Sequence, residues 1–146
     1  VLERVPSDQL GWKPHDKSMS LGALAAHVAG IPGMIASMSQ PVVFEMPADY
    51  KTPAPTSTAD LLKAHDDSLA NAKKIVGAYA DGQLMENWTW QAGGKPLMTM
   101  PRIALLRAVM LNHWYQHRGQ LGVYLRLLGM QVPASYGPSG DESPFG

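Results

Sequence analysis

The chain has 146 residues, with twelve basic side chains, twelve acidic side chains and no cysteine. This length fits a single domain, residues 1–146, with a sizeable buried core, and the balanced charge argues against a nucleic-acid partner. The lack of cysteine excludes disulfides, thiolate zinc sites and a cysteine nucleophile. We find no signal peptide and no apolar run near the roughly 20 residues of a membrane span, so we expect a cytoplasmic protein.

The N-terminal third predicts the end of one helix, a loop and a first long helix. Residues 1–5 are typical of a last helical turn, and residues 6–19 of a polar loop. Apolar residues then recur at three- and four-residue spacing from about Leu21 to Ser39, which predicts a helix. Its first amides can be capped by Ser20 or by Ser18.

A histidine lies within the apolar face of this first long helix. His27 shares the face with residues at helical spacing. These residues are Leu24, Ile31, Met34 and Met38. Pro32 should kink the helix without ending it. The next stretch, residues 40–56, contains four prolines, which prevent a helix or a central strand. It therefore predicts a long crossover of the kind found in some four-helix bundles.

A second long helix is predicted from about Thr58 to Tyr79, entered through a capping-box-like segment that begins at Ser57. Its apolar face also carries His65. The other residues of that face are Leu61, Leu62, Leu69, Ala72 and Val76. Residues 82–100 alternate in polarity and contain two adjacent glycines, which favours a short hairpin or structured loop; an irregular lid is the alternative.

The last helix is predicted from Pro101 to Leu128, with Gly129 as its C-terminal stop. The residues beyond it form a surface tail rich in Pro, Gly and Ser. His113 and His117 lie four residues apart on one face of this helix, together with apolar residues. These are Ile103, Leu106, Val109, Met110, Leu121, Tyr124 and Leu128. Both imidazoles should therefore point into the core.

Two core-facing imidazoles predict either a metal site or hydrogen-bonded core histidines. Burying both among aliphatic groups is costly unless each nitrogen finds a partner. A divalent cation satisfies His113 and His117 together and suits their spacing. His27, on the apolar face of another helix, completes the minimum protein ligand set for an open catalytic site. We therefore predict that the three histidines form a divalent-metal site.

Three further residues are candidates for the surroundings of that site. His65 could be a fourth ligand, a general base or a core histidine, and we favour pocket lining or packing. Gln120 and Tyr124 lie close to the direction of His113 on the helix and could orient a ligand, with simple packing equally expected of Tyr124. His15 follows a proline in a loop and is expected to be solvated, while Arg118 points away from the histidines.

Four segments stand out as candidate family motifs. They are Trp12-Lys13-Pro14-His15, Leu24-Ala25-Ala26-His27 and Asn112-His113-Trp114-Tyr115-Gln116-His117-Arg118-Gly119-Gln120-Leu121, together with the tail from Val132-Pro133 to Ser139. These segments resemble the DinB-like family of bacterial metal-binding helix bundles. The segment that begins at His113 is the most specific of these. The resemblance extends over nearly the whole chain.

The resemblance implies an all-α four-helix bundle with a long crossover after its second helix. It also implies a nickel- or zinc-type site with one histidine on the second helix and two on the fourth, roles that fall on His27, His113 and His117. Members of known activity are thiol-dependent transferases or isomerases. The family's first helix is reduced here to residues 1–5, so either an N-terminal segment is omitted or another chain, as in a homodimer, supplies the missing wall.

We accordingly expect a divalent-metal-binding bundle that acts as a thiol-dependent transferase or hydrolase of a small molecule. Its pocket would be lined by helix faces and by Trp88 or Trp90, and its low-molecular-weight thiol would be external because the chain has no cysteine. The alternatives are a non-catalytic metal- or small-ligand-binding bundle, closed by His65 or a carboxylate, and a structural interaction domain whose histidines only pack.

Overall fold

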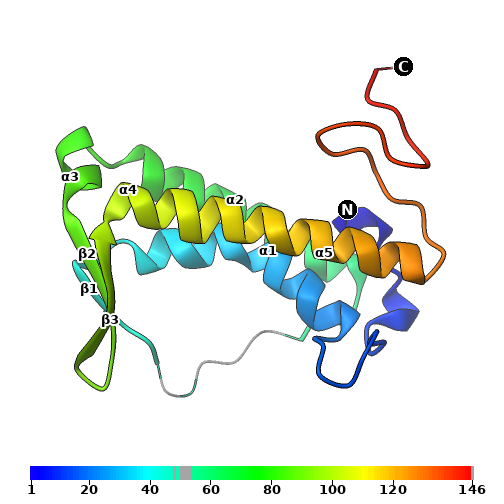
Figure 1. Ribbon diagram of the computed structural model, residues 1–146, viewed down its shortest axis with the longest axis horizontal. Coiled ribbons are helices and arrows are strands. Elements are labelled where there is room, and N and C mark those ends of the chain that lie inside the picture. Colours follow the sequence, from blue (N-terminus) through cyan, green and yellow to red (C-terminus); the bar gives the residue numbers. More distant parts are fainter. Residues whose placement is uncertain (48, 50–53, 146) are drawn as a thin grey trace.

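The computed structural model describes residues 1–47, 49 and 54–145. The elements in chain order are η1 (Leu2–Arg4), η2 (Ser7–Gln9), α1 (Leu21–Met38), β1 (Val43–Glu45), α2 (Thr58–Gly77), α3 (Asp81–Met85), β2 (Asn87–Ala92), β3 (Lys95–Pro101), α4 (Arg102–Ala104), η3 (Leu105–Asn112) and α5 (His113–Leu127). The long helices lie side by side along the long axis of the molecule, and the strands gather at one end (Figure 1).

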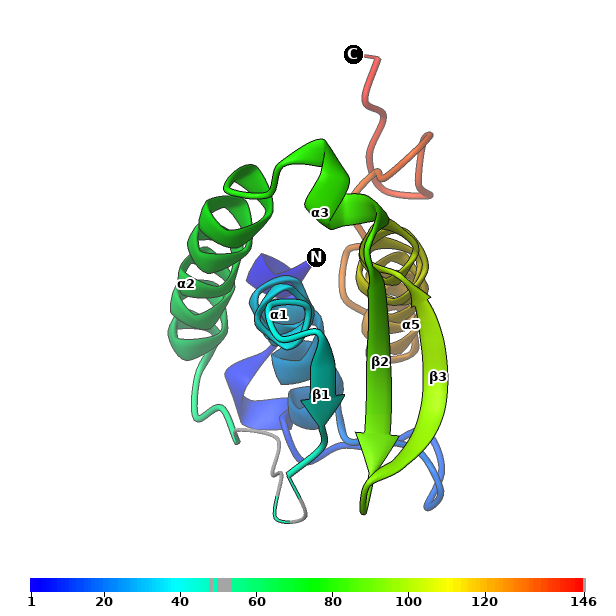
Figure 2. The same cartoon turned by 90° about the vertical axis from the view of Figure 1, so that its left-hand side faces the viewer.

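α1 is the central helix, with α2 along one side and α5 along the other (Figure 2). The Ser20 side chain accepts a hydrogen bond from the Ala23 amide at 3.1 Å and so caps α1 as predicted. Pro32 lies inside the helix without ending it. Gly33 allows α2 to approach closely, because a Cβ there would lie 2.8 Å from the Ser68 carbonyl oxygen.

α1 is also the one helix among the described residues that is long and apolar enough to cross a membrane. With 18 residues, α1 approaches the roughly 20 residues of a membrane span, which we did not expect of any apolar run in this sequence. In the fold, 67% of its 18-residue apolar window is buried. A helix that is apolar on nearly all sides is the type expected at the centre of a packed bundle, and we read α1 as such a core helix.

The second long helix agrees with its predicted bounds to within two residues at its C-terminal end. The Ser57 side chain accepts a hydrogen bond from the Asp60 amide at 3.1 Å, which caps the helix. α2 buries only a narrow stripe, formed by Leu61, Ala72 and Ile75. The stripe packs on α1, so the rest of the α2 surface is exposed or half-buried.

Residues 87–101 form the predicted hairpin, β2 antiparallel to β3, with Gly93 and Gly94 in the turn at φ of 56° and 72°. Positive φ is accessible to glycine without strain. The proline-rich stretch contributes β1, which pairs parallel to β2 in the sheet order β1-β2-β3. The prediction of a helical bundle with a small hairpin is therefore confirmed in part: most of the chain is helical, but β1 extends the hairpin to a three-stranded sheet that was not predicted.

The predicted last helix is not one uniform α-helix. It begins with the short α4, continues as the π-helical segment η3 and becomes α-helical at His113. Hydrogen bonds from residue i to i+5 change the angular step per residue. Ile103, which was placed on the histidine face by α-helical spacing, is consequently 42% exposed. The face predicted for residues 113–128 is not affected by this change.

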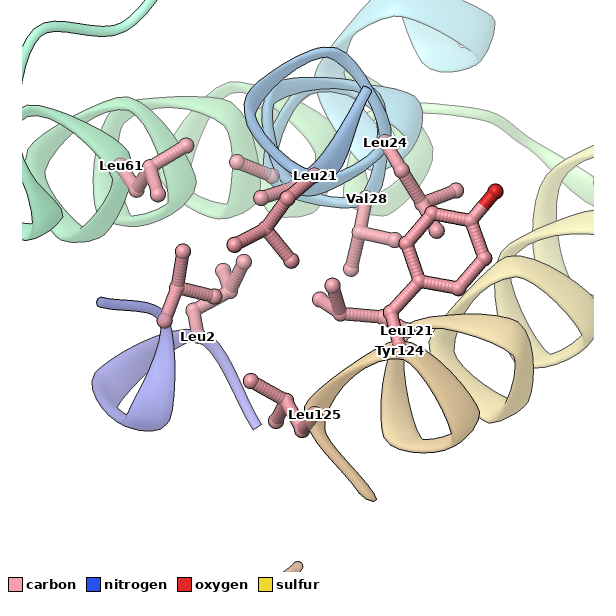
Figure 3. Close-up of a cluster of buried hydrophobic side chains, with 11 residues drawn as sticks. Leu2, Leu21, Leu24, Val28, Leu61, Leu121, Tyr124 and Leu125 are labelled. Carbon is pink, nitrogen blue, oxygen red and sulfur yellow. The ribbon is translucent and has the colours of Figure 1, made fainter. Parts of the chain in front are cut away.

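Two apolar clusters fill the interior. The first joins the start of α1 to the end of α5 and includes Leu2 and Val5 from the chain's first residues (Figure 3). These residues form a 3₁₀ turn where a last helical turn was predicted. The second cluster joins the end of α1 to η3 and the sheet, and includes the fully buried Trp88. The half-buried Trp114 packs against both clusters.

Candidate metal centre

Three histidines from two helices converge between the long helices. His27 lies in the middle of α1, and His113 and His117 occupy the first two turns of α5. The Nε2 atoms of His27 and His113 are 3.3 Å apart, and the ring centroid of His117 lies 4.7 Å from that of His27 and 4.5 Å from that of His113. One ligand atom from each residue falls within 4.8 Å of the other two.

The local structure explains why both histidines of α5 face His27. Residues four apart on an α-helix share one face, and the helix becomes α-helical at His113 itself. The preceding eight residues, Leu105–Asn112, are π-helical. Such segments are rare and are frequently found at functional sites, where they alter the direction in which side chains leave the helix.

The surroundings favour neutral imidazoles. Burial, followed by the proximity of His117 and then of His113, lowers the pKa of His27 to about 4. Burial and the nearby His117 also lower the pKa of His113, although a hydrogen bond with the Val109 backbone opposes this shift. A neutral imidazole keeps a lone pair on one nitrogen, which is the form that binds metals. The donor set therefore fits a divalent transition metal.

Gln120 adjoins the cluster from the next turn of α5. Its Oε1 atom lies 3.0 Å from Nδ1 of His117, so this ring nitrogen can donate to the amide oxygen. With the proton on Nδ1, the lone pair of His117 is on Nε2. Hydrogen bonds of this kind orient ligating histidines and fix their tautomer, which is the role that the sequence analysis offered for Gln120.

Tyr124 was the second candidate for orienting a metal ligand, but its side chain lies in the first apolar cluster (Figure 3). The residue is 4% exposed. Its ring stands edge-to-face against that of Trp12, with 5.5 Å between the ring centroids. Its hydroxyl donates to the carbonyl of Met19 at 3.3 Å. These contacts are those of a core residue.

His65 likewise stands apart from the three histidines. It projects from α2 toward Trp114, with ring centroids 5.9 Å apart, and lines a separate cavity of about 310 Å³. Its Nδ1 atom is buried without a hydrogen-bond partner among the described residues. His15 is exposed, and its Nδ1 atom accepts from the Lys17 amide at 3.1 Å, in keeping with a loop histidine.

A cavity of about 610 Å³ opens beside the three histidines. Helices α1 and η3 form one side, and the sheet forms the other through Phe44, Trp88, Trp90 and Met98. The tryptophans were expected to line a pocket. Phe44 and Met46 were not, because β1 lies in a stretch predicted to be a plain crossover. The short apolar run that includes Val43 and Phe44 was the available signal for this wall.

These features define the class of protein as a mainly helical bundle with a three-histidine cluster next to an apolar cavity. The chain belongs to the DinB family, whose family profile matches residues 1–144. It is 29% identical over 144 residues to the uncharacterized protein YrdA of Bacillus subtilis (strain 168), an alignment that spans 97% of this chain and 81% of YrdA.

Solved structures of DinB-like proteins have the same fold. A DinB-like protein from Bacillus cereus ATCC 10987 superposes with a TM-score of 0.70 at 23% identity, over 92% of this chain and 85% of that one. The DinB-like protein YjoA of Bacillus subtilis gives a TM-score of 0.68 at 22% identity, with the same coverage. At these identities the similarity concerns the fold alone.

Proposed function

We propose that this chain is a metal-dependent enzyme that acts on a small molecule, with His27, His113 and His117 as the ligands of one nickel or zinc ion. The observation that carries the proposal is the convergence of three half-buried imidazoles, with ligand atoms within 4.8 Å of one another, beside a cavity of about 610 Å³. Imidazole nitrogen suits zinc, nickel, copper and iron, and the resemblance to the DinB-like family favours nickel or zinc among them.

An open coordination sphere favours the enzyme over a non-catalytic metal protein. In the part of the chain that the structure describes, no aspartate, glutamate or further histidine joins the three-residue group. Three protein ligands leave a position for water or substrate, as in catalytic sites. His65, which would close the sphere under the alternative, contacts Trp114 and lines another cavity.

When bound, the cation supplies Lewis acidity that lowers the pKa of a thiol or water offered from outside. The residues of the chain do the rest. His27 and His113 present neutral imidazoles, Gln120 holds the ring of His117, and the apolar wall excludes water from the reacting partner. Because the chain has no cysteine, a thiol nucleophile has to be a low-molecular-weight cofactor. We propose thiol-dependent transfer to a small electrophile, or hydrolysis.

Elemental analysis of protein purified without an affinity tag tests the metal. We expect about one nickel or zinc per chain in the wild type and loss of that metal in His27→Ala and His113→Ala. His15→Ala is the matched control, because His15 is exposed and is not part of the three-histidine group. The proposal would be wrong if the wild-type protein contained no stoichiometric metal and its stability did not respond to added nickel or zinc.

A screen of several low-molecular-weight thiols against small electrophiles tests the reaction. We expect thiol-dependent turnover in metal-loaded wild type and its loss in His113→Ala. Hydrolysis predicts turnover without any thiol. A homodimer, the cytoplasmic location and the absence of nucleic-acid and membrane partners stay predictions; light scattering in solution measures the first of them.

A further inference from the structure

The cavity beside the histidines is elongated and extends from them toward the sheet. His27 lies eleven residues before Met38, the last residue of α1, and both line the cavity. At 1.5 Å per residue the helix rises by roughly 16 Å between them. Leu105 and His117 line a similar length from η3 and α5. Met38 and Leu105 pack with Trp88 of the sheet in the second apolar cluster. The cavity is therefore a trough that leads from the histidines to the end of the molecule where the strands gather (Figure 1).

Away from the histidines, the described residues of the trough offer a ligand no free polar side chain. None of the lining residues is lysine, arginine, aspartate or glutamate. The Ser37 hydroxyl donates to the carbonyl of Gly33 and accepts from the side-chain amide of Asn71. The indole nitrogens of Trp88 and Trp90 are buried and out of reach of a ligand. A charged group placed along the trough would lose its hydration without gaining a partner, which is costly.

The surface that the trough does offer is apolar and adaptable. Several of its lining side chains are only half-buried, so they keep exposed area that a ligand can cover. These include Met19, Met34, Phe44, Met46, Met98 and Val109. Methionine side chains are unbranched and flexible, and they fit irregular apolar shapes. Removing this surface from water favours binding of an apolar chain without any polar contact.

We propose that the substrate is a linear, mainly aliphatic molecule whose apolar body lies along the trough and whose polar, reacting end lies at His27, His113 and His117. The position of the reacting end rests on the proposed function, whereas binding of the apolar body does not. The two ends of the cavity thus select different chemistry. A polar or anionic head is matched at the histidines by the cation, and the rest of the length accepts only an uncharged tail.

Alkyl hydroxamates of increasing length test the proposal on the full chain. The hydroxamate head binds divalent metals through its two oxygens, so it holds the polar end at the histidines of nickel-loaded protein. We expect the affinity measured by calorimetry to rise about two- to threefold for each methylene added to acetohydroxamate, because each one is partly buried. The gain should level off near a dodecyl tail, which is about as long as the trough. A hydroxamate with an oligoether tail of the same length should bind no better than acetohydroxamate.

Matched methionine variants locate the tail. Met46→Gln and Met98→Gln place a polar side chain of similar size in the trough at half-buried positions. Each should weaken binding of the dodecyl compound about three- to tenfold and leave acetohydroxamate nearly unchanged, because only the long tail would desolvate the new amide. Met85→Gln is the control, since Met85 is 67% exposed and does not line the cavity.

The proposed substrate and the proposed metal fail in different ways. An affinity independent of tail length, an oligoether compound that binds as tightly as the alkyl one, or variants at Met46 and Met98 that behave like Met85→Gln would each overturn the aliphatic substrate. An affinity that keeps rising well beyond the dodecyl tail would also contradict it, because unspecific partitioning has no length limit. Equal affinities with nickel and with a chelator, at an unchanged dependence on tail length, would instead refute the metal site alone.

Discussion

The indole N–H of Trp114 donates to the carbonyl oxygen of Val28 at 2.8 Å. In an uninterrupted α-helix this carbonyl would accept from the amide four residues later, but that residue is Pro32, which has no N–H. Val28 adjoins His27, and Trp114 adjoins His113. One hydrogen bond made possible by the proline thus joins α1 to α5 at the place where the two histidines meet.

The Trp114–Val28 bond predicts a measurable coupling. Trp114→Phe leaves the carbonyl of Val28 without a donor and should lower the free energy of unfolding by about 1–2 kcal/mol. In a Pro32→Ala background, the new amide can pair with that carbonyl, so the same change should cost less. Urea unfolding of the two single variants and the double variant gives the coupling energy. Strictly additive losses would contradict this account.

Chelation should destabilise the wild type and not His113→Ala. A ligand that binds only the folded state raises the free energy of unfolding by about 2.7 kcal/mol when its free concentration is 100 times its Kd. Thermal unfolding with and without a chelator measures this difference. His65→Ala is the control, because His65 lies outside the cluster, and it should respond to the chelator as the wild type does. A chelator effect that persists in His113→Ala would count against the ligand set.

Gln120→Ala should weaken metal binding about 10- to 100-fold without abolishing it, since loss of an outer hydrogen bond leaves the ligands in place but less well oriented. The change removes the partner of Nδ1 of His117. Gln116→Ala, another exposed glutamine of α5, is the matched control. Calorimetric titration with zinc compares the variants, and equal affinities would show that the contact does not orient His117.

The metal-free protein should lose stability as the pH falls from about 6.5 toward 4. His27 has a pKa of about 4 in the fold against 6.5 as its ordinary value, so in this window the unfolded chain binds the proton more readily. The stabilising effect of neutral His27 is complete above about pH 6.5, and its loss levels off below about pH 4. Unfolding free energies of wild type minus His27→Gln isolate this slope from that of the carboxyl groups. A flat difference across the window would contradict the lowered pKa.

Arg102 is a further determinant of stability, since it is only 3% exposed. Its guanidinium donates to the carbonyls of Ser39 and Gln83, and lies 5.1 Å from the ring centre of Tyr79. Arg102→Ala should cost about 2–4 kcal/mol, because two carbonyls lose their donors together. Arg107→Ala, an exposed neighbour, should change stability by less than about 0.5 kcal/mol. Chemical denaturation of both variants is the measurement.

The parts of the structure that local signals encode could be predicted. The caps at Ser20 and Ser57 and the spans of α1 and α2 follow from polar residues in front of apolar residues at helical spacing. Periodicity placed His27 and His113 on apolar faces of their helices, and only the family resemblance indicated that these two helices meet.

The parts that depend on contacts between distant segments could not be predicted. The π-helical segment before His113 leaves no mark in α-helical spacing, so Ile103 was assigned to the wrong face. The position of Tyr124 on the helix indicated which way its side chain points, but not that its hydroxyl donates a hydrogen bond to the carbonyl of Met19. β1 is three residues long and is stabilised by pairing with β2, a partner more than forty residues away in the chain.

The parallel pairing of β1 with β2 bears on how the cavity opens. Antiparallel strands can join through a tight turn, whereas parallel strands need a long connection, and here α2 and α3 lie between β1 and β2 in the chain. Contacts so distant in sequence form late in folding, and this edge strand is mostly exposed. We therefore expect β1 to detach more readily than the helices. Local unfolding at β1 would then widen the cavity, while the histidines stay in place on α1 and α5.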